Sequence, residues 1–374
     1  MPAPPSAASP RIKKQVKALL SADPYLAPYQ DAITRRLNRI EKTRLRLTGG
    51  EAGLSDFASG HTWFGLQREE NQWVLREWAP NATALYLIGE LSDWEEREAL
   101  AFRPSGGGDG VWELRLPAAS LGHEDLYRLR VHWAEGSGDR LPAYARRVVQ
   151  DPQSLIFIAQ VWQPESAYEW RNAHFRRPEE APLIYEAHVG MAQESAKVGS
   201  YAEFRQNVLP RVAAAGYNTL QLMAIQEHPY YGSFGYHVSN LFAASSRFGT
   251  PDELKALIDD AHGLGLAVII DLVHSHAVAN EVEGLSRFDG SLYQYFHDLP
   301  RGYHEAWDSR LFDYGKIEVL HFLLSNCRFW LEEYRVDGFR FYVITSMLYR
   351  HHGLENAFTG YDDYFDVILE DEAL

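Results

Sequence analysis

The sequence predicts a multidomain protein in which a β-sandwich precedes the first half of an α/β TIM (β/α)8 barrel. Three observations carry this prediction. Short runs of alternating apolar and polar residues lie between 73 and 133, strand and helix patterns alternate from 183 onward, and a helical pattern at 316–334 leads into a short strand. The predicted helical arm, sandwich and partial barrel occupy residues 1–60, 61–165 and 166–374.

The amino-terminal arm is predicted to be helical between residues 10 and 47, because Leu19, Ile33, Leu37 and Ile40 recur at helix-like spacing. Basic residues stand between these apolar positions. We interpret the arm as an amphipathic segment that packs on the rest of the chain and turns its charged face to solvent. Contact of this basic face with a partner is the alternative.

The predicted sandwich contains strand-like runs at residues 73–78, 84–88, 111–116 and 127–133. Turn signals separate these runs, among them the glycine-rich stretches at 106–110 and 136–139. Short strands at this spacing are typical of antiparallel sandwiches of roughly 100 residues. Trp94 follows one of the predicted turns, where its indole either stacks on a flat ligand or belongs to the core.

The barrel segment is predicted from strands at residues 183–189, 218–225, 266–273 and 339–343. Thr250 and Glu253 form a capping-box pattern at the start of one connecting helix. The stretch 274–315 is too long for an ordinary connection, so we predict a functional insertion there. Because eight strands close such a barrel, we expect an incomplete barrel whose open edge permits self-association.

Composition narrows the possible partners. A net charge of −15 argues against nucleic acid and against anionic membranes, since phosphates would be repelled. An aromatic content of 13% suits surfaces that stack on flat ligands, although aromatic cores are the commoner use. Cys327 is the single cysteine, so no disulfide forms within residues 1–374. No run suited to a signal peptide or a membrane span follows the first ten residues, and we predict a cytoplasmic protein.

Polar clusters follow the second, third and fourth predicted strands. They contain Tyr236, then Asp271 and His276, and then Arg340 with Tyr342. Since barrel enzymes hold their sites at the carboxyl ends of the strands, we expect these side chains to converge. The two histidines of the middle cluster give only a weak metal signal, because no cysteine or carboxylate at ligand spacing accompanies them.

The run Gly-Phe-Arg-Phe-Tyr at 338–342 resembles the fourth-strand motif of the alpha-amylase superfamily of glycoside hydrolases, which reads Gly-Phe-Arg-Phe-Asp. The chain resembles above all the eukaryotic-type 1,4-alpha-glucan branching enzymes, through residues 186–191, 229–236, 271–276 and 302–310. The stretch 76–94 is similar to the glycogen-binding-type module that precedes many barrels of this superfamily. This similarity implies that Trp94 stacks on a glucose ring.

The resemblance implies a reaction in glycogen biosynthesis. Branching enzymes cut an α-1,4-glucan (glycogen, starch or amylose) and rejoin the fragment through an α-1,6 linkage with retention, which requires a carboxylate nucleophile and a second carboxyl group. By position, Tyr236 would stack on the sugar and His276 would hydrogen-bond its hydroxyls. Arg340 would orient the nucleophile, and Asp271 would hold the neighbouring loops. The reaction implies no cofactor.

The chain departs from the family at the nucleophile. Tyr342 occupies that position, and we expect it to be non-functional, because a phenol is neutral at pH 7 and larger than a carboxylate. Val343 and Ile344 replace the family's usual Gly-Val. Ser275 stands where calcium-holding members have asparagine, so we expect no metal.

The resemblance also places the general acid and a third catalytic carboxylate on later strands, which residues 1–374 do not contain. We therefore expect a truncated and substituted relative of the branching enzymes that is itself catalytically incompetent. Two alternatives stay open: a non-catalytic glucan-binding protein, and another glycosidase of the amylase superfamily.

Overall fold

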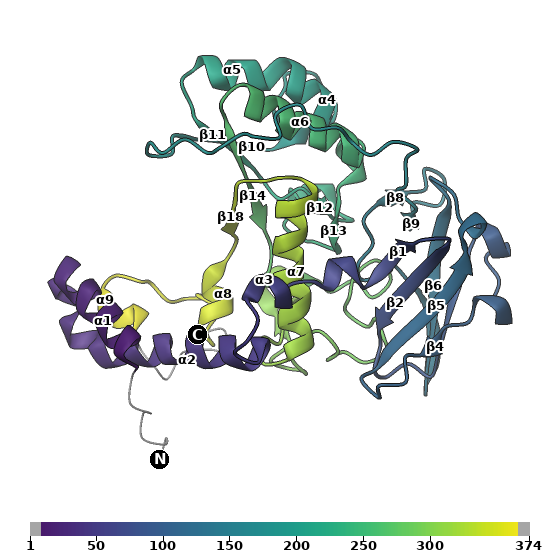
Figure 1. The fold of residues 1–374 in the computed structure, drawn as a ribbon, viewed down its shortest axis with the longest axis horizontal. Coiled ribbons are helices and arrows are strands. Elements are labelled where there is room, and N and C mark those ends of the chain that lie inside the picture. Colours follow the sequence, from purple (N-terminus) through teal and green to yellow (C-terminus); the bar gives the residue numbers. More distant parts are fainter. Residues whose placement is uncertain (1–8, 366–374) are drawn as a thin grey trace.

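The computed structural model describes residues 9–365, which form a helical arm, a β-sandwich and a parallel sheet with its helices (Figure 1). The arm consists of α1 (Pro10–Ala22), a 3-10 turn (Pro24–Tyr29) and α2 (Gln30–Thr48). The predicted helix is broken once, because Asp23 has extended backbone geometry and Pro24 follows it. Ile12, Val16 and Ile33 form the small core between the two helices.

Two antiparallel sheets form the sandwich, as predicted, in the orders β1-β2-β5-β4 and β3-β6-β9-β8, with β7 also paired to β6. Their bounds are β1 Gly65–Glu69, β2 Gln72–Trp78, β3 Ala84–Gly89, β4 Arg103–Pro104, β5 Val111–Pro117, β6 Leu126–Trp133, β7 Gly136–Arg140, β8 Val148–Gln150 and β9 Phe157–Gln160. The prediction that 136–139 is only a turn is wrong. This stretch pairs with β6 through its backbone, which requires no apolar side chain.

Four parallel strands form the second sheet in the order β10-β11-β14-β18, which confirms the predicted partial barrel pattern. Their bounds are β10 Ile184–Ala187, β11 Thr219–Leu222, β14 Ala267–Leu272 and β18 Gly338–Phe341. Leu220, Val268 and Ile270 are fully buried, as strands that are covered on both faces require.

The helices of this part lie between the strands in sequence. Their bounds are α4 Tyr201–Glu203, which continues through a π-helical turn (Phe204–Val208) into α5 Leu209–Ala214, then α6 Pro251–Gly263 and α7 Ile317–Glu333. The predicted capping box of α6 is present: the Glu253 amide donates to Thr250 Oγ1 at 3.2 Å, and the Thr250 amide donates to Glu253 Oε2 at 2.8 Å. The capping box fixes the start of α6, as expected from the sequence.

The long stretch 274–315 contains a small antiparallel sheet and contacts the sandwich. The short strands of this region and of the loop after β11 are β12 Gln226–Glu227, β13 Asn240–Ala244, β15 His276–Val278, β16 Tyr303–His304 and β17 Ser309–Leu311. The Asn81 amide of the sandwich donates to Asp289 Oδ2 at 3.0 Å, and Arg140 Nε donates to the Arg287 carbonyl at 2.8 Å. The insertion therefore ties the sandwich to the parallel sheet.

The arm also contacts the last described residues, where α9 lies beside α1 (Figure 1). The helices here are α3 Leu54–Phe57, α8 Ile344–Leu348 and α9 Tyr361–Tyr364. The rings of Tyr29 and Phe365 stack with centroids 4.7 Å apart, and the Tyr361 hydroxyl donates to Asp23 Oδ2 at 2.8 Å. Segments more than 300 residues apart thus pack together.

The outer strands β10 and β18 expose apolar side chains, among them Ile184 at 43% and Phe341 at 39%. The predicted self-association through this edge stays a prediction. Within residues 9–365, no helix is long and apolar enough to cross a membrane.

Candidate functional site

The carboxylate of Asp271 is the centre of the strand-end site. It is fully buried near the end of β14 and accepts hydrogen bonds from Gln221 Nε2 at 2.9 Å, the Tyr236 hydroxyl at 2.7 Å and Arg340 Nη1 at 2.7 Å. Both carboxylate oxygens therefore have partners. Asp271 joins strands β11, β14 and β18 and the loop of Tyr236 into one network.

The charges of this network fix the protonation of its donors. Burial lowers the pKa of Arg340, but the hydrogen bond and the charge of Asp271 outweigh it, and the net pKa is raised. Burial, followed by the hydrogen bond and the charge of Asp271, raises the pKa of Tyr236. The carboxylate of Glu186 on β10 acts on both groups in the same direction. Arg340 therefore stays charged and Tyr236 neutral at pH 7.

Tyr342 covers the ring of Tyr236. The two rings stack with centroids 4.1 Å apart at an interplanar angle of 29°, and the Arg340 guanidinium lies 5.3 Å from the centroid of the Tyr342 ring. The Tyr342 amide donates to the Leu272 carbonyl at 3.0 Å, so the residue continues the line of β18 beside β14. The ring face of Tyr236 on this side is consequently occupied by protein.

His276 is held by protein contacts on both ring nitrogens. Nε2 lies 3.0 Å from the Tyr236 carbonyl, Nδ1 lies 2.9 Å from Ser275 Oγ, and the ring stacks on Trp307 of the insertion at 5.8 Å. Burial is the main cause that lowers the pKa of His276 to about 4, so the ring is neutral at pH 7. Within residues 9–365, no group of three or more His, Cys, Asp or Glu side chains is arranged to hold a metal ion.

The structure thus brings Tyr236, Asp271, His276, Arg340 and Tyr342 together, as the strand-end argument predicts. Gln221, Glu186 and Trp307 also belong to the site and were not predicted as its members. The signal for Gln221 was a polar residue inside the apolar run of the second strand. Glu186 and Trp307 lay in runs that were quoted only for their family resemblance.

Known proteins match both parts of this architecture. Carbohydrate-binding module 48 (isoamylase N-terminal domain) matches residues 63–152, and the alpha amylase catalytic domain matches residues 212–297. Proteins named 1,4-alpha-glucan-branching enzyme from Rhizophagus irregularis and Aspergillus oryzae are 48% and 46% identical over 92% and 95% of the chain. Over nearly its whole length, the chain is thus a relative of the 1,4-alpha-glucan-branching enzymes.

The similarity extends to plant members of the branching-enzyme family. The 1,4-alpha-glucan-branching enzyme 2-2, chloroplastic/amyloplastic, of Arabidopsis thaliana is 45% identical over 96% of this chain. The chain spans about half the length of the curated relatives it matches, 51% for the Rhizophagus protein and 45% for the Arabidopsis protein.

Solved structures support the fold. A pullulanase from Paenibacillus barengoltzii, in complex with maltohexaose and alpha-cyclodextrin, aligns with a TM-score of 0.64 at 18% identity, over 81% of this chain and 52% of that one. A putative alpha amylase from Salmonella typhimurium aligns with a TM-score of 0.61 at 23% identity, over 75% and 43% of the two chains. A sandwich followed by part of an amylase-type barrel is confirmed.

Within the branching-enzyme motif, the residue after Tyr342 has an unusual backbone. Val343 has φ 53° and ψ 50°, in the left-handed region. A β-branched residue is strained there, whereas glycine, the family's usual residue, adopts this conformation freely. The departure from the family motif therefore carries a conformational cost at the end of β18.

Trp94 lies apart from the strand-end residues in the fold, because it follows β3 of the sandwich. It is half-buried with φ 63°, and its amide donates to the Gly89 carbonyl at 3.0 Å. A module of the branching-enzyme family would present such a ring to a sugar, and this role stays a prediction.

An aromatic cavity of about 270 Å³ lies between the sandwich and α7. Trp63, Phe64, Trp78, Tyr144 and Tyr295 are among its lining residues, and Trp63 is 43% exposed. No local sequence pattern predicts this cavity, because some of its rings come from segments more than 200 residues apart. Aromatic faces of this kind are suited to stacking on sugar rings.

Proposed function

We propose that this chain binds α-1,4-glucan, the polymer on which branching enzymes act, but does not itself cut it. The observation that carries the proposal is the position of Tyr342, which stands at the family's nucleophile position and stacks on Tyr236 with ring centroids 4.1 Å apart. In the family's arrangement Tyr236 would stack on the sugar, but in this chain Tyr342 covers its ring, and Asp271 holds its hydroxyl at 2.7 Å.

The chemistry explains why cleavage is not expected. Retaining transfer requires one carboxylate that attacks the anomeric carbon and a second carboxyl group that protonates the leaving oxygen. Tyr342 supplies no carboxylate. Asp271 is a poor substitute, because its two oxygens already accept hydrogen bonds from Gln221, Tyr236 and Arg340. His276 is also engaged through both ring nitrogens, so its sugar contacts would require a rearrangement.

The test uses the purified chain and amylose. We expect no loss of iodine colour and no new α-1,6 linkages, together with slower migration in native gels that contain glycogen. Branching by this chain would refute the assignment of Tyr342. Release of reducing ends without α-1,6 linkages would favour a different glycosidase, and unchanged migration would refute glucan binding.

Binding is expected to depend on the aromatic cavity and the module more than on the covered cleft. Trp63→Ala should reduce the retardation in glycogen gels several-fold, because this exposed indole lines the cavity. Tyr236→Ala should change it little, since Tyr342 already covers that ring. Trp94→Ala tests the predicted role of the module separately.

Two further expectations belong to this proposal. The chain is expected to be cytoplasmic. It is expected to self-associate through the exposed edge strands β10 and β18, and sedimentation at increasing concentration tests this.

A further inference from the structure

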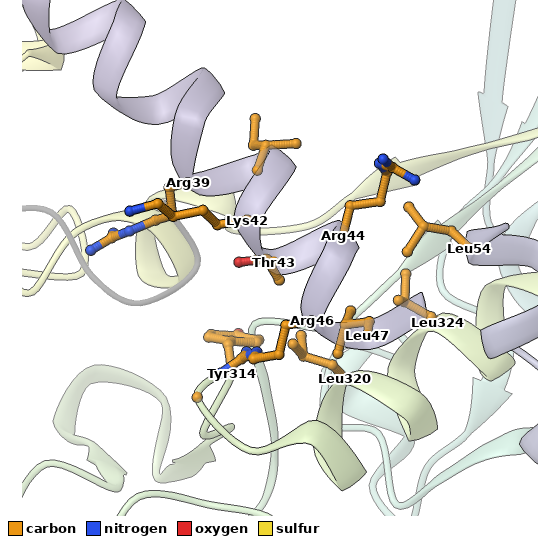
Figure 2. A pocket seen from close by; sticks show the side chains of 12 residues that line it. Arg39, Lys42, Thr43, Arg44, Arg46, Leu47, Leu54, Tyr314, Leu320 and Leu324 are labelled. Atoms are coloured by element: carbon orange, nitrogen blue, oxygen red, sulfur yellow. The ribbon is translucent and has the colours of Figure 1, made fainter. Parts of the chain in front are cut away.

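A cavity of about 480 Å³ lies between α2, α3 and α7, and its lining contains none of the residues of the strand-end network (Figure 2). Its apolar side is made by Leu47 of α2, Leu54 of α3, Leu320 and Leu324 of α7, and the ring of Tyr314. The volume lies in the range of about 300–1,000 Å³ that is usual for small-molecule sites, which are mostly apolar with a few polar groups.

All charged side chains that line the cavity are basic. Arg39, Lys42, Arg44 and Arg46 line it from α2, and none of the described lining residues is acidic. The chain as a whole has the opposite balance, with 51 acidic and 36 basic residues. The positive charge is therefore a local feature of this cavity.

Two of these cations are available to a ligand. Arg44 pairs with Glu41 at 2.8 Å, so part of its charge is compensated. Lys42 and Arg46 are exposed, and neither makes a hydrogen bond or an ion pair with the part of the chain that the structure describes. In Figure 2, Lys42 and Arg46 extend from the same helix that contributes Leu47.

The lining favours an anion over a neutral sugar. Sugar hydroxyls need acceptors as well as donors, but Lys42 and Arg46 only donate, and Thr43 is the one neutral polar side chain besides Tyr314 among the described lining residues. The Tyr314 hydroxyl already donates to the His274 carbonyl at 2.8 Å. A ligand must therefore supply acceptors, negative charge and an apolar surface for the leucines. We infer that the cavity binds a small organic anion, in which a carboxylate, sulfonate or phosphate group is attached to an apolar or aromatic body.

This inference does not depend on glucan binding. The probe is 8-anilinonaphthalene-1-sulfonate, an aromatic sulfonate whose fluorescence rises in apolar sites, titrated into the full chain. Lys42→Gln with Arg46→Gln should weaken binding about tenfold, the sum of two charge-assisted contacts. Thr43→Trp, which places a large ring at this side of α2, should also weaken it. The matched control is Arg11→Gln with Lys14→Gln, which removes the same charge from exposed positions of α1.

Three outcomes would overturn the inference. The first is equal affinity of the wild type and the Lys42 and Arg46 double variant, because the probe would then bind elsewhere, for example at the edge strands. The second is an equal loss in the control variant, which would indicate a general charge effect. The third is tight binding of the chain to vesicles of anionic phospholipid that depends on Lys42 and that a soluble aromatic sulfonate does not compete away. The basic face of α2 would then be a membrane contact. Inorganic phosphate alone should compete weakly, since it has no apolar body.

Discussion

Glu77 is expected to make the stability of this protein fall as the pH rises. It lies in β2, is fully buried, and receives one long hydrogen bond of 3.4 Å from the Ala143 amide to Oε2. Its Oε1 has no partner among the described residues. Burial, with a smaller contribution from the charge of Glu77, raises the pKa values of the nearby hydroxyls of Tyr127, Tyr144 and Tyr295. Burial, opposed only by the Ala143 bond, raises the pKa of Glu77 to about 8.

The size of the effect follows from this shift. In the unfolded chain the pKa is near 4.5, so between pH 4.5 and about 8 the folded state holds a proton that the unfolded state has lost. The stabilisation by protonated Glu77 is therefore complete below pH 4.5 and is lost as the pH rises through the folded pKa. At 1.36 kcal/mol per pKa unit, about 3 kcal/mol is lost by pH 7 and up to ~5 kcal/mol by pH 8.

Glu77→Gln removes this titration while it keeps the size of the side chain. Near pH 5 we expect the variant to be as stable as the wild type or slightly less stable, because the amide adds donors to an apolar site. Near pH 8 it should be more stable by about 3 kcal/mol. Urea denaturation at several pH values between about 5 and 9, followed by tryptophan fluorescence, measures the difference. Glu95→Gln, at an exposed position, is the control. Parallel pH profiles of the wild type and Glu77→Gln would refute the reasoning.

Other changes test the strand-end site. Val343→Gly should raise the free energy of unfolding by about 1 kcal/mol, because glycine relieves the left-handed strain. Val343→Ala should raise it less. If urea denaturation shows no gain in stability for Val343→Gly, this residue is not strained. Asp271→Asn should lower the free energy of unfolding by about 2 kcal/mol, since Arg340 loses its buried partner, and unchanged stability would show that the network contributes nothing. Tyr342→Ala should strengthen retardation in glycogen gels about fivefold by uncovering Tyr236, without branching, and weaker binding would contradict the stacking argument. Tyr342→Asp alone should likewise restore no branching activity on amylose.

Much of the fold could be predicted because burial imposes a regular pattern on the sequence. Continuous apolar residues gave the position of β14, and the capping box gave the start of α6. Strand β7 was missed because backbone pairing, rather than apolar side chains, makes its glycine-rich stretch a strand. The break between α1 and α2 was also missed, although Pro24 was its local signal.

The sequence by itself determined the order of strands and helices, the family motifs and the exchange of a carboxylate for Tyr342, because these depend on residue identity and short spacings. Only the tertiary structure decided that Tyr342 covers Tyr236, that Gln221 completes the environment of Asp271, and that the basic face of α2 lies over the leucines of α7. The physical reason is that such contacts join side chains from distant segments. Their geometry depends on how the sheet and the helices pack, which no local pattern records.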